Sequence, residues 1–126
     1  MSREAGRSQI MVVDDEPMLR LNLTDILEDA GHTVLDAPTA DAGLAILEGG
    51  CGARVVVTDV HMPGEINGFQ LAEVICHRWP HIGVVIVSGR LRPSDDDLPD
   101  DSRFLSKPVH PDLLTSTVQE VAALHG

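Results

Sequence analysis

The sequence predicts an α/β fold in which helices cover both faces of a doubly wound, five-stranded parallel sheet. Short apolar runs rich in β-branched residues alternate with helical patterns along the chain, which is the order that such a fold requires. The runs at 55–57 and 84–87 are apolar at every position rather than at alternate ones. Continuous apolar runs are typical of central parallel strands that are buried on both sides.

Five short runs predict the strands. The first four consist mostly of valine, isoleucine and leucine, which favour strands. The fifth is weaker because only two apolar residues stand together in it. In chain order the runs lie at 10–13, 33–35, 55–57, 84–87 and 104–105.

Amphipathic patterns between the strands predict the helices. The first follows Pro17, a residue favoured in the first turn, and Thr39 can cap the second, which ends at Gly49-Gly50. The third ends before Pro80, and the last begins near Pro111 and runs almost to the final residue. The apolar stripes are Leu19, Leu23, Ile26, Leu27 and Ala30; Ala42, Ala45 and Ile46; Leu71, Ala72, Ile75 and Trp79; and Leu114, Val118, Val121 and Ala122.

The stretch 91–102 does not follow this pattern. It holds two prolines and five aspartates and lacks a convincing apolar stripe, so any helix there is short or degenerate. One interpretation is an acidic docking surface for a basic partner. We favour the simpler one, a solvated mobile loop.

Length and composition limit the class of protein. A chain of 126 residues is the size of one domain, and we expect 1–8 to form a disordered N-terminal segment and 9–126 to form the domain. No leader is evident, and no apolar run approaches the roughly 18 residues of a membrane span. We therefore expect a cytoplasmic protein without a membrane partner.

The charge balance argues against nucleic acid as a partner. Nine basic residues stand against twenty acidic ones, so the formal net charge is −11 and the pI is near 4.7. Such a chain repels polyanions. The only aromatic residues are Phe69, Trp79 and Phe104, too few for a base-stacking surface.

Polar side chains follow four of the five predicted strands. In a doubly wound sheet functional groups gather past the carboxyl ends of the strands, so we expect these side chains to meet at one edge. Three aspartates gathered there repel one another, so their pKa values rise or a divalent cation lies among them, and oxygen ligands of this kind suit Mg²⁺. The groups are Asp14, Asp15 and Glu16 after the first strand, Asp59 after the third, Ser88 after the fourth and Lys107 after the fifth.

Each of these residues alone has a simpler interpretation. Asp14 and Asp15 would cap a helix, Asp59 and Ser88 would occupy turns, and Lys107 would be a surface lysine before a proline. Four separate turns that each offer a group needed for phosphoryl chemistry favour the functional interpretation.

Four motifs make the chain resemble the response-regulator receiver family of two-component signalling, over Ile10 to about Leu124. They occur in the family's order and with similar spacing, and together they are specific. The motifs are VVDDE at 12–16, VTDVHMPG at 57–64, VIVSG at 85–89 and FLSKP at 104–108.

The resemblance implies a flavodoxin-like strand order of 2-1-3-4-5 and a receiver domain over 9–126. It implies that Asp59 is the phosphoacceptor and takes its phosphoryl group from a histidine kinase, a histidine phosphotransfer protein or a small acyl phosphate. The chain would signal by protein contact without a DNA-binding output domain. It would not be an enzyme beyond phosphorylating and dephosphorylating itself.

The resemblance also implies the roles of the other site residues. Mg²⁺ would be bound directly by Asp15 and Asp59, through water by Asp14, and by the backbone carbonyl of His61. Lys107 would hold a phosphoryl oxygen. The switch pair would be the Ser88 hydroxyl and the Phe104 ring, and the peptide bond before Pro108 would be cis.

Two departures from the family pattern stand out. The loop GEING at 64–68 is one residue longer than the usual turn, which leaves the geometry beside the metal open. The acidic stretch 91–102 replaces what is ordinarily a full fourth helix, which belongs to the usual dimerisation and output face. The sequence therefore leaves open whether the chain dimerises through the usual face, and with it the oligomeric state.

Two other functions compete with a phosphorylated receiver. The first is a module of the same fold that regulates a kinase without being phosphorylated; the intact Asp14, Asp15, Asp59 and Lys107 argue against it. The second is a Mg²⁺-dependent phosphohydrolase with an aspartyl nucleophile, which would normally have a second acid two residues later. Position 61 is histidine, which weakens that interpretation.

Overall fold

A computed structural model describes residues 9–60, 64–89 and 102–125. The segment 1–8, which was expected to be disordered, and most of the acidic stretch 91–102, where any helix was expected to be short or degenerate, lie outside these residues, as does His61. Among the helices that the structure describes, none combines the length and the apolar character that crossing a membrane requires.

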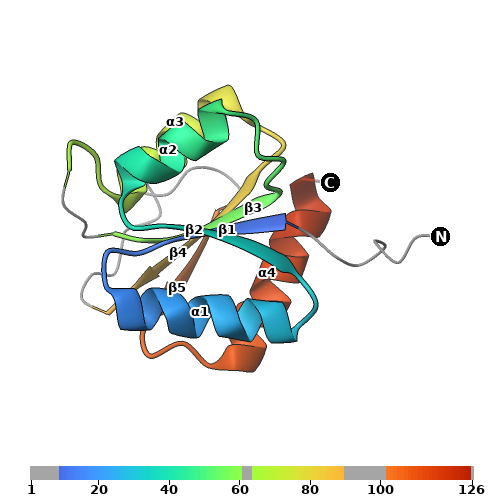
Figure 1. Cartoon of the computed structure of the whole chain (residues 1–126). Coiled ribbons are helices and arrows are strands. Elements are labelled where there is room, and N and C mark those ends of the chain that lie inside the picture. The colour runs from blue at the N-terminus through green and yellow to red at the C-terminus, as the bar shows by residue number, and fades with distance from the viewer. Residues whose placement is uncertain (1–8, 61–63, 90–101, 126) are drawn as a thin grey trace.

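The strands form one parallel sheet in the order β2-β1-β3-β4-β5 (Figure 1). This confirms the predicted fold class and strand order. The fifth strand is longer than its two apolar residues suggested, because it pairs with the buried fourth strand along its whole length. The bounds are β1 Gln9–Val13, β2 Thr33–Ala37, β3 Val55–Asp59, β4 Gly83–Ser88 and β5 Arg103–Ser106.

Helices cover both faces of the sheet, as predicted. In Figure 1, α2 and α3 lie on one face, and α1 and α4 lie on the other. Thr39 caps α2 by accepting a hydrogen bond from the Ala42 N–H at 3.1 Å. The bounds are α1 Pro17–Asp29, α2 Ala40–Glu48, α3 Gly68–Arg78 and α4 Pro111–His125.

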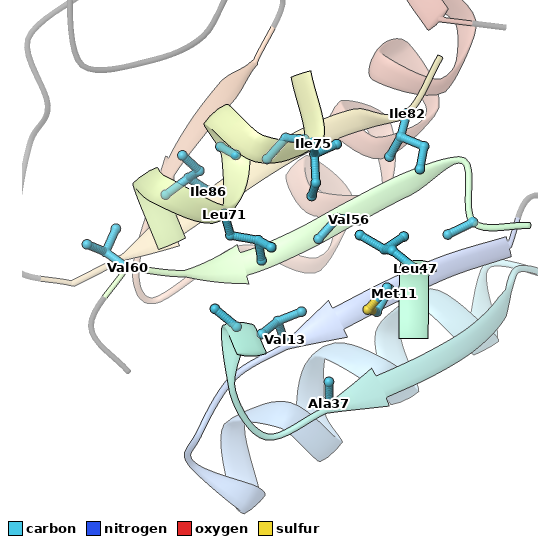
Figure 2. Packing of buried hydrophobic residues seen from close by; sticks show 14 residues of the cluster. Met11, Val13, Ala37, Leu47, Val56, Val60, Leu71, Ile75, Ile82 and Ile86 are labelled. Carbon is cyan, nitrogen blue, oxygen red and sulfur yellow. The ribbon is translucent and has the colours of Figure 1, made fainter. Parts of the chain in front are cut away.

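The apolar core is divided between the two faces. Met11 and Val13 of β1 point toward α2 and α3 (Figure 2), whereas Ile10 and Val12 of the same strand pack on the opposite side with α1 and α4. All the residues of β4 are likewise buried. Burial of alternate residues against two helical layers explains why the strand sequences are continuously apolar. The layers fix the carboxyl ends of the strands, where the site lies.

Candidate functional site

The predicted polar groups converge at the carboxyl edge of the sheet. In the sheet, β2 lies on one side of β1 and β3 lies on the other. The strand order therefore reverses at β1 and β3, and the site lies past the carboxyl ends of these two strands. An open, polar cavity of about 490 Å³ occupies this edge. It is lined by Asp15, Glu16, Leu19, Asp59, Ser88, Gly89 and Lys107.

Asp14, Asp15 and Asp59 form an acidic cluster. Each can offer a carboxylate oxygen, and these oxygens lie within 4.8 Å of one another. Asp14 is fully buried, Asp59 is half-buried and Asp15 is exposed. Three hard oxygen donors, one of them open to solvent, fit a divalent cation such as Mg²⁺ that keeps several water ligands.

Burial raises the pKa of Asp14 above its ordinary value of 3.8. The N–H of Glu16, which donates to Asp14 Oδ1 at 2.9 Å, and the Lys107 ammonium act in the opposite direction on this pKa. The Asp59 carboxylate raises it further. Burial is the largest of these effects, so the ionised form of Asp14 is disfavoured in the cluster without a metal.

Lys107 lies between two members of the cluster. Its Nζ is 3.5 Å from Asp14 Oδ2 and 3.4 Å from Asp59 Oδ2. Its backbone N–H donates to the Ser88 carbonyl at 3.0 Å, and its peptide bond to Pro108 is cis, as the resemblance implied. A single ammonium thus contacts both carboxylates at the edge of the cavity.

The two carboxylate oxygens of Asp59 have different partners. Oδ1 accepts the backbone N–H of Val60 at 2.7 Å, whereas Oδ2 faces Lys107. The Thr58 hydroxyl donates to the Asp59 carbonyl at 2.9 Å. These contacts fix the side chain and the backbone of Asp59 at the end of β3.

The two expected switch residues lie in different surroundings. Ser88 ends β4, is buried and lines the cavity. Phe104 is half-buried on β5, where it packs against the apolar core on the side of α2 and α3. Ser88 therefore lies at the site, whereas Phe104 packs against the core and does not line the cavity.

The described part of the loop before α3, residues 64–67, is held by three contacts. The Glu65 N–H donates to Asp41 Oδ2 of α2 at 3.0 Å, and Ile66 packs on the core. Asn67 caps α3 in a reciprocal capping box with Gln70. The spacing N-x-x-Q at 67–70 is the sequence signal from which this cap could have been predicted.

Gly68 closes this loop against the site. Its N–H donates to the Val60 carbonyl at 2.9 Å, and a Cβ at position 68 would clash with the Asp59 carbonyl and lie 2.9 Å from the Val60 Cα. Both obstacles are backbone, so neither can rotate away. Only glycine permits this approach of α3 to the end of β3.

We expect Gly68→Ala to destabilise the fold by about 1–3 kcal/mol, the cost of forcing a methyl group into a packed site. Chemical unfolding would measure this loss. Gly49→Ala is the matched control, because a Cβ there meets only ordinary contacts of 3.4 Å or more at negative φ. Equal stabilities of the two variants would contradict the close approach.

Asp14 should make the metal-free protein less stable as pH rises. Its raised pKa means that the folded chain holds this proton more tightly than the unfolded chain. The resulting stabilisation is present in acid and is lost as pH rises above about 4 and through the raised pKa.

We expect Asp14→Asn to raise the unfolding temperature at neutral pH by a few degrees in the presence of a chelator, because the buried charge is gone. The decline in stability from acidic to neutral pH should also become shallower. Thermal scans across this range would test both effects, with the exposed Asp25→Asn as control. A lower unfolding temperature for Asp14→Asn would contradict the account.

Comparison with known proteins identifies the class. Residues 10–119 match the family model described as "Response regulator receiver domain". The chain therefore belongs to the response regulator receiver family, the signalling domains of two-component systems.

The named proteins that this chain resembles range from single receiver-sized chains to much longer proteins. Protein PilH of Pseudomonas aeruginosa is 30% identical, and the match covers 92% of this chain and 98% of PilH. Sensor kinase CckA of Brucella abortus is 32% identical over 93% of this chain, which spans only 13% of that protein. A response regulator receiver protein from Sinorhizobium medicae has a TM-score of 0.87 at 26% identity, covering 97% of this chain and 99% of that one.

Proposed function

We propose that this domain accepts a phosphoryl group on Asp59 in a Mg²⁺-dependent reaction and signals by protein contact. The observation that carries the proposal is the contact of the Lys107 ammonium with both Asp14 and Asp59 inside a cluster of three carboxylates. This arrangement offers a nucleophile, a set of metal ligands and a cation for a phosphoryl oxygen. Membership of the receiver family supports the same chemistry.

Asp14, Asp15 and Asp59 would hold Mg²⁺, with Asp15 and Asp59 as the direct ligands. When bound, Mg²⁺ neutralises charge on the phosphoryl and carboxylate oxygens. Lys107 would leave the carboxylates and contact a phosphoryl oxygen by a charge-assisted hydrogen bond. The His61 carbonyl, expected as a further ligand, belongs to residues that the structure does not describe.

Asp59 would be the nucleophile of the transfer. A carboxylate oxygen of Asp59 attacks phosphorus, and the bond from phosphorus to the donor imidazole nitrogen, or to the acyl oxygen, breaks. The electron pair of that bond leaves with the imidazole, which takes its proton from solvent, or with the acyl group, which departs as a carboxylate. The protein contributes position and charge neutralisation.

The added group would be detected at Ser88. A phosphoryl group brings about −1.5 to −2 charges and strong acceptor oxygens. The Ser88 hydroxyl, already at the cavity, would donate to one of them, and Phe104 would follow inward behind it. This pair of movements would reshape the surface that a partner contacts.

We infer that the donor is a histidine kinase or a histidine phosphotransfer protein. Similarity to part of a protein named as a sensor kinase supports this class of partner. The net charge of −11 argues against nucleic acid, and we propose a cytoplasmic domain that is not an enzyme apart from its own phosphorylation and dephosphorylation.

Intact mass spectrometry would test the proposed function. The chain is incubated with a small acyl phosphate in Mg²⁺ or in a chelator, and a gain of one phosphoryl group is expected only with Mg²⁺. Beryllofluoride, a phosphoryl mimic, should bind under the same conditions. Failure of both reagents would contradict the proposal and favour a module that acts without phosphorylation.

A further inference from the structure

Arg20 of α1 contacts the backbone of Asp14, a member of the acidic cluster. Its Nη1 donates to the backbone carbonyl of Asp14 at 2.9 Å, and its Nε donates to Asp36 Oδ2, also at 2.9 Å. The Arg20 side chain is 21% exposed, whereas that of Asp36 is 57% exposed. One planar guanidinium thus links Asp36, near the end of β2, to Asp14 of the acidic cluster.

The Asp14 carbonyl takes this partner at the end of the strand ladder. β1 and β2 pair as far as Val13 and Ala37, and the Asp14 N–H still donates to the Ala37 carbonyl at 3.1 Å. The ladder ends there, because β2 stops at Ala37. Beyond this point the Arg20 side chain, rather than a strand, holds the backbone of Asp14.

Arg20 is also part of the turn that carries the carboxylates. Its own N–H donates to the Glu16 carbonyl at 2.9 Å, and the Glu16 N–H donates to Asp14 Oδ1 at 2.9 Å. The main-chain bond is the first helical hydrogen bond of α1, which any residue at position 20 would make, so the contribution specific to Arg20 is its side-chain contact with the Asp14 carbonyl at the start of the turn 14–16. A contact that fixes the backbone of Asp14 opposes the mutual repulsion of the carboxylates, which would otherwise push them apart.

We propose that Arg20 is a positioning residue that holds Asp14 and Asp15 in place for Mg²⁺, and that Asp36 orients its guanidinium. The inference rests on the proposed function, since it presumes that the cluster binds the metal. Arginine suits the role because its rigid fork can donate to two acceptors in fixed directions. Groups behind the metal ligands commonly set metal affinity in this way.

Charge alone predicts the opposite result. Arg20 is a cation near a cation site, so its removal should strengthen Mg²⁺ binding if it acted only through its field. Loss of positioning should weaken binding. The sign of the change in Mg²⁺ affinity therefore separates the two explanations.

Isothermal titration of Mg²⁺ into the full chain would measure this change. We expect Arg20→Gln and Arg20→Lys each to weaken binding by roughly tenfold, the usual scale for a group behind the ligands. Lysine keeps the charge but loses the fork. Asp36→Asn, a milder change at an exposed residue, should weaken binding in the same direction.

Arg78→Gln is the matched control. Arg78 is half exposed, and its ion pair with Glu48 at 2.8 Å joins the C-terminal ends of α3 and α2, which lie at the opposite edge of the sheet. This variant removes the same charge and one ion pair, so Mg²⁺ affinity should stay within about twofold because salt screens distant charges.

A second measurement detects loss of position without metal. The Glu16 amide signal in metal-free NMR spectra should shift or broaden in the Arg20 variants and stay unchanged in Arg78→Gln. Unchanged or tighter Mg²⁺ binding by Arg20→Gln would overturn the role of Arg20 alone. If the native chain binds no Mg²⁺, the metal site and the role of Arg20 both fail.

Discussion

Asp59→Asn is expected to abolish phosphoryl uptake while leaving the fold intact. The amide has a similar shape and can still accept the Val60 N–H, which donates to Asp59 Oδ1 at 2.7 Å. It lacks the anionic oxygen that attacks phosphorus, so no covalent product should form. Intact mass spectrometry after incubation with acyl phosphate and Mg²⁺ would detect the loss.

The control for this variant is Asp25→Asn, which removes the same charge from an exposed position on α1. It should take up the phosphoryl group as the native chain does. Thermal unfolding should show that both variants fold. Full uptake by Asp59→Asn would mean that another residue is the acceptor.

Lys107→Ala should have two effects of opposite sign. Phosphoryl uptake should slow by roughly 100-fold, the scale on which one charged donor stabilises a transferring group. Mg²⁺ should bind more tightly, because the ammonium that lies 3.5 Å from Asp14 and 3.4 Å from Asp59 no longer competes with the metal. Time-resolved mass spectrometry and titration of Mg²⁺ would measure the two effects.

Arg103→Ala is the matched control for Lys107→Ala. Arg103 is the first residue of β5, the strand that Lys107 directly follows, and it pairs at 3.4 Å with an exposed residue, Glu120, so its removal deletes one positive charge outside the cavity. It should change neither the rate of uptake nor Mg²⁺ affinity substantially. Slower uptake without tighter Mg²⁺ binding in Lys107→Ala would show that Lys107 does not restrain the carboxylates.

Much of the fold followed from local sequence patterns. The continuous apolar runs predicted buried parallel strands, and the rule that functional groups lie past their carboxyl ends correctly grouped Asp14, Asp59, Ser88 and Lys107. The resemblance supplied the strand order. These predictions succeeded because each depends on the spacing of residues along one element or on the direction of a strand.

Features that depend on how elements meet could not be predicted. The contact of Arg20 with Asp14 and Asp36 requires the relative placement of α1 and β2, and no local pattern distinguishes Arg20 from an ordinary surface arginine. The close approach of Gly68 to the Asp59 carbonyl likewise appears only when α3 packs on the end of β3. The same holds for the difference in burial between Asp14 and its neighbour Asp15.

Borohydride trapping would identify the aspartate that carries the phosphoryl group. Borohydride reduces an aspartyl phosphate to homoserine, so it marks the acceptor permanently before the phosphoryl group is lost. The native chain is phosphorylated in Mg²⁺, reduced and digested, and its peptides are sequenced by mass spectrometry. We predict homoserine at position 59 and at no other aspartate. Homoserine at another aspartate, or at none in a chain that had gained a phosphoryl group, would contradict the account.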